Sequence, residues 1–169
     1  MLYAKLLAQA KENIVIWDPY YQIDCKRLFC EIRSNEITVE VLTICQGYES
    51  KRDIQDFADV ILSAIDKTFV PKCVVTVLAL KKDYMERHTW ASDWHDRYLI
   101  IDKEVYLVGT SMDAQEAKSV TFGIKRLTDT QDKNLVIDTY VAYRDNVKDV
   151  SMDSGRNPVS NGFICTARR

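Results

Sequence analysis

The chain has 169 residues, 47% of them apolar and 28% charged. This is enough for one globular domain with its own core, and a second domain would be cramped. Lys and Arg number 23 against 25 Asp and Glu, a formal charge of −2, which excludes a generally basic nucleic-acid-binding or membrane-surface protein and leaves only a local basic patch. We find no signal peptide in Met1–Lys11 and no apolar run long enough to span a bilayer, so we expect a cytoplasmic protein.

The cysteines are odd in number, sit mostly inside apolar runs and show no short ligand-like spacing such as CxxC. They are Cys25, Cys30, Cys45, Cys73 and Cys165. This usage predicts reduced core thiols of a cytosolic protein.

The first half of the chain alternates between helical and strand patterns. Apolar spacing and β-branched runs predict helices over Leu2–Ala10, Asp24–Arg33 and Ile54–Ile65, and strands over Ile14–Trp17, Ile37–Ile44 and Cys73–Leu80. Pro19 ends the first strand, which places Asp18 at its carboxyl edge. Alternation of this kind predicts parallel βαβ units in a layered α/β domain.

The second half begins with a long polar loop and then becomes hairpin-like. The pattern predicts a loop over Lys81–Trp94, an antiparallel pair of strands over Arg97–Ile101 and Val105–Val108, a short helix over Asp113–Lys118, a strand over Val120–Ile124 and a helix over Asn134–Val147. From Ser151 onward Ser, Asn, Gly and Pro dominate. We therefore expect one domain over residues 1–150 and a C-terminal tail without firm structure over residues 151–169.

His95 and Arg97 form the most informative pair in the sequence. Side chains alternate along a strand, so these two emerge on one face while Asp96 turns away. An imidazole can attack phosphorus or donate a proton near neutral pH, and a guanidinium can hold phosphoryl oxygens. The pair therefore predicts a site for a phosphate ester.

The pattern His95-x-Arg97-(x)4-Asp102-(x)6-Gly109-Thr110 resembles the HxK(x)4D(x)6GS signature of the phospholipase D superfamily. The resemblance implies an α/β fold with a mixed β-sheet flanked by helices on both faces. It also implies phosphodiester cleavage through a phosphohistidine, with no metal ion and no other cofactor. His95, Arg97 and Asp102 would be catalytic, with Asp102 orienting His95, and Thr110 and Ser111 would bind the substrate.

The chain carries one copy of the motif, whereas the superfamily reaction uses two histidines. Similarity to the single-motif bacterial nucleases of the family implies a homodimer in which His95 of each subunit faces the other. We expect a nucleic acid or another phosphodiester as substrate. The basic clusters that could meet its phosphates are Lys81-Lys82, Arg87, Lys118 and Lys125-Arg126.

The sequence departs from the signature at two positions. Arg97 replaces the lysine, which keeps the positive charge in a different shape. Met112 replaces an asparagine of the longer signature, and a thioether cannot donate the hydrogen bonds of an amide. The alternative is therefore a catalytically degenerate module that serves dimerisation or binds an anionic ligand, a lipid head group or a protein.

Several residues keep a second interpretation. Arg97 could be an ion-pair partner of Asp102 or Asp113, and Thr110 and Ser111 could cap a helix. His88 could be a second acid or an exposed loop histidine, and Trp90 and Trp94 could stack on a base, join a dimer interface or close the core. Asp18 and Tyr20 could line a ligand site at the end of the first strand or merely form a turn.

Overall fold

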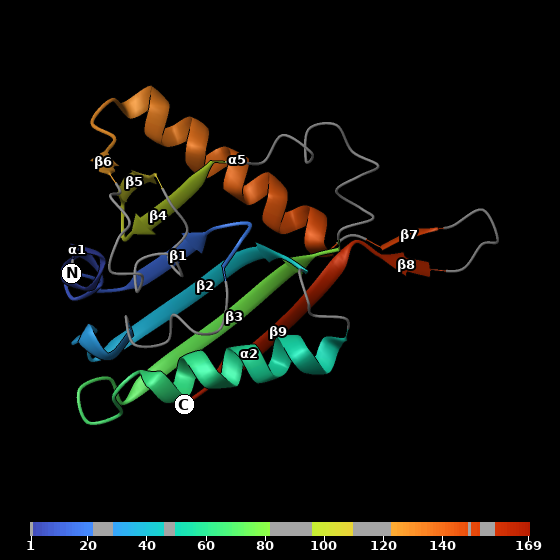
Figure 1. The fold of residues 1–169 in the computed structure, drawn as a ribbon, viewed down its shortest axis with the longest axis horizontal. Coiled ribbons are helices and arrows are strands. Elements are labelled where there is room, and N and C mark those ends of the chain that lie inside the picture. Colours follow the sequence, from blue (N-terminus) through green and yellow to red (C-terminus); the bar gives the residue numbers. More distant parts are fainter. Residues whose placement is uncertain are drawn as a thin grey trace.

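The structure is a computed structural model that describes residues 2–21, 29–45, 50–81, 96–109, 123–148, 150–152 and 158–169. Seven of the described strands form one mixed sheet in the order β6-β5-β4-β1-β2-β3-β9 (Figure 1). Their bounds are β1 Asn13–Trp17, β2 Glu36–Ile44, β3 Lys72–Leu80, β4 Arg97–Ile101, β5 Glu104–Val108, β6 Ile124–Arg126 and β9 Gly162–Arg168. A separate hairpin pairs β7 (Val150–Met152) with β8 (Pro158–Ser160).

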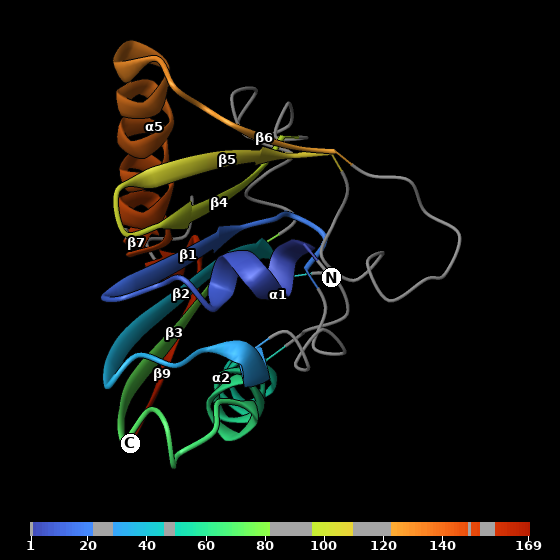
Figure 2. The ribbon, with the colours of Figure 1, turned by 90° about the vertical axis from the view of Figure 1, so that its left-hand side faces the viewer.

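Helices cover both faces of the sheet, as predicted. Helices α1 (Leu2–Leu7) and α2 (Lys51–Ala64) lie on one face and α5 (Thr130–Lys148) on the other (Figure 2). Two buried clusters hold these layers together: Ile54 and Phe57 belong to the cluster of the α1/α2 face, and Tyr140 and Tyr143 to that of the α5 face. The prediction of an α/β fold with a mixed sheet is confirmed.

The predicted strand pairing is also confirmed. Strands β1, β2 and β3 run parallel, and β4 and β5 form an antiparallel hairpin around Asp102 and Lys103. Asp102 has a φ of 54°, a left-handed conformation that aspartate tolerates better than most residues.

Both long helices begin earlier than the apolar spacing predicts, because polar caps extend them. Ser50 and Asp53 form a capping box at the start of α2. The Asp129 carboxylate accepts hydrogen bonds from the backbone amides of Gln131 and Asp132, at 2.8 and 3.1 Å, before the first turn of α5.

The expectation of an unstructured tail after residue 150 is wrong. Strand β9 pairs antiparallel with β3 over seven residues, from Val74 opposite Arg168 to Leu80 opposite Gly162. Cys165 and Ala167 of β9 are buried in the main core. The Ser-, Asn- and Pro-rich composition that suggested a tail belongs to the residues before β9, so the domain extends to the C-terminal strand.

Some predictions fall partly or wholly outside the described residues. These are the first half of the helix over Asp24–Arg33, the loop over Lys81–Trp94 except Lys81, the helix over Asp113–Lys118 and the start of the strand over Val120–Ile124. Of the described cysteines, Cys73 and Cys165 are buried as expected, whereas Cys30 is exposed. None of the described helices has the length and apolar character needed to cross a membrane.

Candidate functional site at the carboxyl edge of the parallel strands

The parallel strands β1, β2 and β3 all end at the same edge of the sheet. Because β4 is antiparallel to β1, with Trp17 paired to Tyr98, β4 begins where β1 ends. Arg97 at the start of β4 is paired to Val108 at the end of β5. The edge therefore gathers chain segments that are far apart in the sequence, at the position where α/β proteins commonly bind ligands.

Arg97 is held at this edge by two residues that follow β1. Its Nε lies 3.5 Å from Oδ1 of Asp18, whose side chain is only 3% exposed, whereas that of Arg97 is 23% exposed. The guanidinium carbon of Arg97 lies 4.9 Å from the centroid of the Tyr20 ring. A cation that contacts both a buried carboxylate and an aromatic face is fixed in direction while part of it still reaches solvent.

The local sequence explains why Asp18 and Tyr20 take these positions. Pro19 cannot continue the ladder, so the chain turns directly after β1. Oδ1 of Asp18 accepts a hydrogen bond from the backbone amide of Tyr20 at 2.9 Å, and the Asp18 carbonyl accepts one from Tyr21 at 3.2 Å. Tyr21 anchors the turn because its ring stacks on Phe57 of α2, with centroids 5.6 Å apart.

The ion pair has an electrostatic consequence for the site. A buried carboxylate without a partner is costly, so Asp18 and Arg97 stabilise each other's charged form. A guanidinium has five N–H donors in a fixed fork, and Asp18 faces Nε. This arrangement allows an Arg97 oriented by Asp18 to present its remaining donors to an anionic oxygen.

Three of the predicted site residues, His95, Thr110 and Ser111, lie outside the described residues. The positions beside them are described. Asp96 follows His95 directly, and Gly109 precedes Thr110 and donates a backbone hydrogen bond to Gly123 at 2.9 Å. Because Arg97 and Val108 are paired, Asp96 and Gly109 flank the pair at the same edge as Arg97.

Asp102 is not at this edge. It lies in the turn after β4, five residues beyond Arg97 and thus about 17 Å along an extended strand. Its carboxylate accepts hydrogen bonds from the backbone amides of Lys11, Glu12 and Asn13, at distances from 2.9 to 3.4 Å. The structure therefore gives Asp102 a role at the start of β1, and its predicted role of orienting His95 stays a prediction because His95 lies outside the described residues.

The pKa of Asp102 reflects the same contacts. Burial raises this pKa, but the backbone amides of Asn13, Glu12 and Lys11 outweigh that effect, and the pKa lies below its ordinary value. The alternative interpretation of Arg97 as an ion-pair residue holds, but its partner is Asp18 and not Asp102. The sequence signal for Asp18 was its place at the carboxyl end of the first strand.

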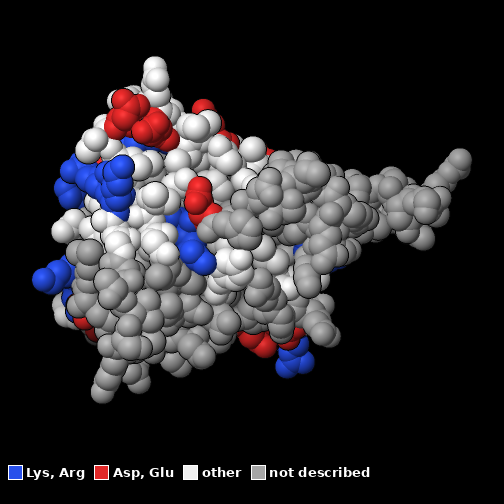
Figure 3. Space-filling model, turned by 45° about the horizontal axis from the view of Figure 1, so that its top comes forward, with Lys and Arg blue, Asp and Glu red and all other residues white. Residues whose placement is uncertain are grey.

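The described charged residues do not form one broad basic field. Basic side chains lie next to acidic ones on the face shown in Figure 3, and Glu104 pairs with both Arg126 at 2.8 Å and Lys133 at 3.9 Å. Lys81 follows β3 and Lys125 belongs to β6. Four other strands lie between β3 and β6 in the sheet. These two predicted basic clusters therefore do not converge; Lys82, Arg87 and Lys118 lie outside the described residues.

Within the described ranges, no group of three or more His, Cys, Asp or Glu side chains could hold a metal ion. A pocket next to Arg97 lies on the opposite face of the sheet. It is lined by Asp96, Tyr98 and Trp17, together with four residues of α5 that include Tyr143.

Comparison with known proteins supports the fold. No protein-family model and no curated protein sequence matches the chain. The chain is similar in structure to NucT from Helicobacter pylori, with a TM-score of 0.52 and 14% sequence identity over 84% of each chain. It is also similar to TrmBL2, an archaeal chromatin protein described with a novel mode of DNA binding, with a TM-score of 0.44 and 12% identity over 83% of this chain.

The chain spans 46% of the length of TrmBL2. The likeness to NucT is one of fold, a mixed seven-stranded sheet with helices on both faces.

Proposed function

We propose that the chain is a phospholipase D-like phosphodiesterase that cleaves nucleic acid without a metal ion and acts as a homodimer. The observation that carries the proposal is the fixed position of Arg97, held by Asp18 and Tyr20 at the carboxyl edge of the parallel strands. His95 stands two residues earlier in the chain, at the spacing of the motif. The likeness of fold to NucT, which is nuclease-like, adds support.

In the proposed reaction, a ring nitrogen of His95 attacks the phosphorus of the diester and forms a nitrogen–phosphorus bond. The bond from phosphorus to the leaving oxygen breaks, and that oxygen takes a proton from the partner subunit's His95. Water then attacks the phosphohistidine, gives a proton to the same partner imidazole, and releases the phosphomonoester. Arg97 holds the non-bridging oxygens, on which negative charge builds up in the transition state.

The homodimer follows from the chemistry of a single motif. One imidazole cannot be the covalent nucleophile and the general acid in the same step, so a chain with one motif needs a second copy. Twofold dimers are the commonest oligomers, and their symmetry brings the same residue of both subunits to one axis.

The Arg97–Asp18 ion pair also favours a second candidate function. A carboxylate 3.5 Å from Nε compensates part of the cation's charge and weakens its attraction for a phosphate. Together with Met112 in place of the signature's asparagine, this fits a catalytically degenerate module of the same fold that dimerises or binds an anionic ligand, a lipid head group or a protein.

A metal-free nuclease assay separates the two functions. Single-stranded DNA, RNA, duplex DNA and a generic phosphodiester are incubated with the wild-type chain in excess EDTA, with His95→Ala as the matched variant. We expect turnover of at least one substrate by the wild type and none by His95→Ala. Absence of His95-dependent turnover on all four would reject the enzyme in favour of the binding module.

A further inference from the structure

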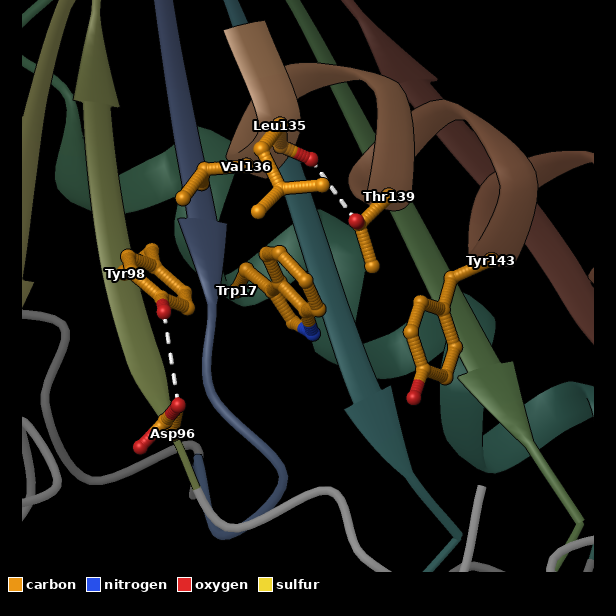
Figure 4. A pocket seen from close by; sticks show the side chains of 7 residues that line it. All are labelled: Trp17, Asp96, Tyr98, Leu135, Val136, Thr139 and Tyr143. Atoms are coloured by element: carbon orange, nitrogen blue, oxygen red, sulfur yellow. Dashed lines mark hydrogen bonds between the residues drawn. The ribbon is translucent and has the colours of Figure 1, made fainter. Parts of the chain in front are cut away.

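A small pocket lies on the α5 face of the sheet, beside the edge that carries Arg97 (Figure 4). Its volume is about 200 Å³, below the roughly 300 Å³ at which sites for drug-sized ligands begin. The residues that define its character are Trp17, Asp96, Tyr98, Leu135, Val136 and Tyr143. A pocket of this size takes one ring system of a larger ligand.

Aromatic side chains make one wall of the pocket. The Trp17 ring is packed between Tyr98 and Tyr143, with centroid distances of 5.0 and 5.3 Å and interplanar angles of 35° and 53°. Trp17 and Tyr143 are only 3% and 6% exposed, so they fix the wall from within the core, and the partly exposed Tyr98 presents its surface. A rigid aromatic wall offers a contact surface to a flat ring at a low cost in conformational entropy.

Helix α5, which also carries Tyr143, supplies a second wall through Leu135 and Val136 (Figure 4). Leu135 is 68% exposed, which is unusual for a leucine on a helix that packs against a sheet. Its position at the pocket gives this exposure a use, because a ligand between Leu135 and the aromatic wall would cover it. The two apolar walls together form a slot that suits a planar group.

Asp96 gives the slot its polar specificity. Its Oδ2 accepts a hydrogen bond from the Tyr98 hydroxyl at 3.3 Å. An ionised carboxylate has about four acceptor positions and no donor, so the exposed Asp96 can accept further bonds. Burial and the charge of Asp96 raise the pKa of Tyr98, which keeps its hydroxyl a donor to Asp96. The complement of this polar group is a donor such as an exocyclic amino group.

The pocket and the candidate active site share strand β4. Side chains alternate along a strand, so Asp96 and Tyr98 face α5 while Arg97 between them faces Asp18 on the other side. A polynucleotide that crosses this edge of the sheet can therefore place one phosphate at Arg97 and a flanking base in the pocket.

We propose that this pocket binds the unpaired, amino-bearing base, cytosine or adenine, of a nucleotide next to the scissile phosphate. The inference rests on the proposed nuclease function and specifies its substrate as single-stranded at this position, since a paired base cannot enter the slot. Carboxylates read amino groups of bases, and aromatic walls bind bases by stacking. An organic cation fits less well, because the three rings pack on one another and do not surround a common point.

The test measures binding, so it does not depend on cleavage. Fluorescent homopolymers of dC and dT are titrated against the full chain carrying His95→Ala, and their affinities are read from fluorescence anisotropy. We expect dC to bind about tenfold more tightly than dT. Asp96→Asn, whose amide can donate, lowers the affinity for dC about tenfold and abolishes or reverses the preference.

Exposed positions supply matched variants that are compatible with folding. Leu135→Ala weakens both homopolymers about threefold, because it removes one wall of the slot. Asp56→Asn makes the same charge change on an exposed residue of α2, on the other face, and Phe69→Ala truncates another exposed apolar residue. Neither control is expected to change the affinity or the base preference.

Equal affinities for dC and dT that Asp96→Asn and Leu135→Ala leave unchanged would overturn the proposal. Displacement of dC by tetramethylammonium but not by sodium at equal ionic strength would also overturn it, in favour of an organic-cation site. Cleavage that depends on His95 but shows no base preference would contradict base binding in the pocket and leave the nuclease function standing. An Asp96-dependent preference in a chain that cleaves nothing supports base binding and contradicts only the nuclease function.

Discussion

The carboxylate of Asp18 lies 3.5 Å from Nε of Arg97 and joins the end of β1 to the start of β4. Both residues stand next to the backbone pair Trp17–Tyr98, so the sheet register brings their side chains to one edge. The ion pair fixes Arg97, the cation of the motif. The coupling energy between the two residues can be measured without knowledge of the substrate.

A double-mutant cycle tests this coupling. Arg97→Met leaves a buried carboxylate without its partner and should lower the free energy of unfolding by about 3 kcal/mol. Asp18→Asn leaves the partly exposed cation and should cost about 2 kcal/mol. The loss of unfolding free energy in the double variant should be smaller than the sum of the two single losses, by at least about 1 kcal/mol. Urea unfolding followed by circular dichroism gives all four values, and additive losses would show that the two residues are not coupled.

Substitution of Arg97 tests its role in catalysis. Arg97→Ala should lower kcat for the metal-free reaction by about 100-fold or more, since it removes charge stabilisation of the transition state. Arg97→Lys restores the cation of the family signature and should stay within about tenfold of the wild type. The control is Lys103→Ala, which removes an exposed cation at the far end of β4. Equal activity of Arg97→Ala and the wild type would exclude Arg97 from the reaction.

Asp102 should matter for stability instead of for turnover. Asp102→Asn keeps a residue that tolerates the left-handed backbone but loses a charged acceptor of three backbone amides, at a cost of about 2 kcal/mol at pH 7. Asp138→Asn, an exposed change on α5, is the control and should be neutral.

The pH dependence of the Asp102→Asn effect follows from the lowered pKa of Asp102 in the folded chain. An unfolded aspartate titrates near about pH 3.9. The stabilisation by Asp102 is therefore fully present above that pH and is lost as the pH falls through the lower folded-state pKa. The stability difference between the wild type and Asp102→Asn should shrink below about pH 4. A difference that stays constant down to pH 2 would contradict the lowered pKa.

Gly162 tests whether the C-terminal strand belongs to the domain. A Cβ at this position would lie 2.3 Å from the carbonyl oxygen of Ala79, so Gly162→Ala should destabilise the chain by about 2 kcal/mol or more. Gly123→Ala is the matched control, since a Cβ there meets nothing within 4 Å. Equal melting temperatures for the two variants would show that β9 does not pack against β3.

The periodicity of apolar residues in the sequence predicted most strands of the sheet, because the pattern of buried side chains within each segment decides its secondary structure. Runs such as Ile37–Ile44 and the amphipathic stretch from Ile54 form the expected elements. Strand β9 was missed because its neighbours are turn-forming residues and its pairing with β3 bridges distant parts of the chain. Composition near a strand does not reveal a long-range partner.

The candidate site was predictable only in part for the same reason. The motif spacing singled out Arg97, but its counter-charge depends on the antiparallel pairing of β4 with β1, which sequence spacing does not encode. Asp102 has the spacing of the motif and yet binds the backbone of residues 11–13, at the other end of β4. The pocket of Trp17, Asp96 and Tyr143 joins three separate segments and was not predicted.

The most direct measurement of the central claim is covalent trapping at His95. The chain is mixed with a phosphodiester substrate in EDTA, quenched in alkali, in which phosphohistidine survives, and analysed by mass spectrometry of the peptide that contains His95. We predict a phosphoryl adduct on His95 that is lost in acid, is absent from His95→Ala and is reduced in Arg97→Ala. The account would be contradicted if metal-free turnover gave no adduct and were as fast in His95→Ala as in the wild type.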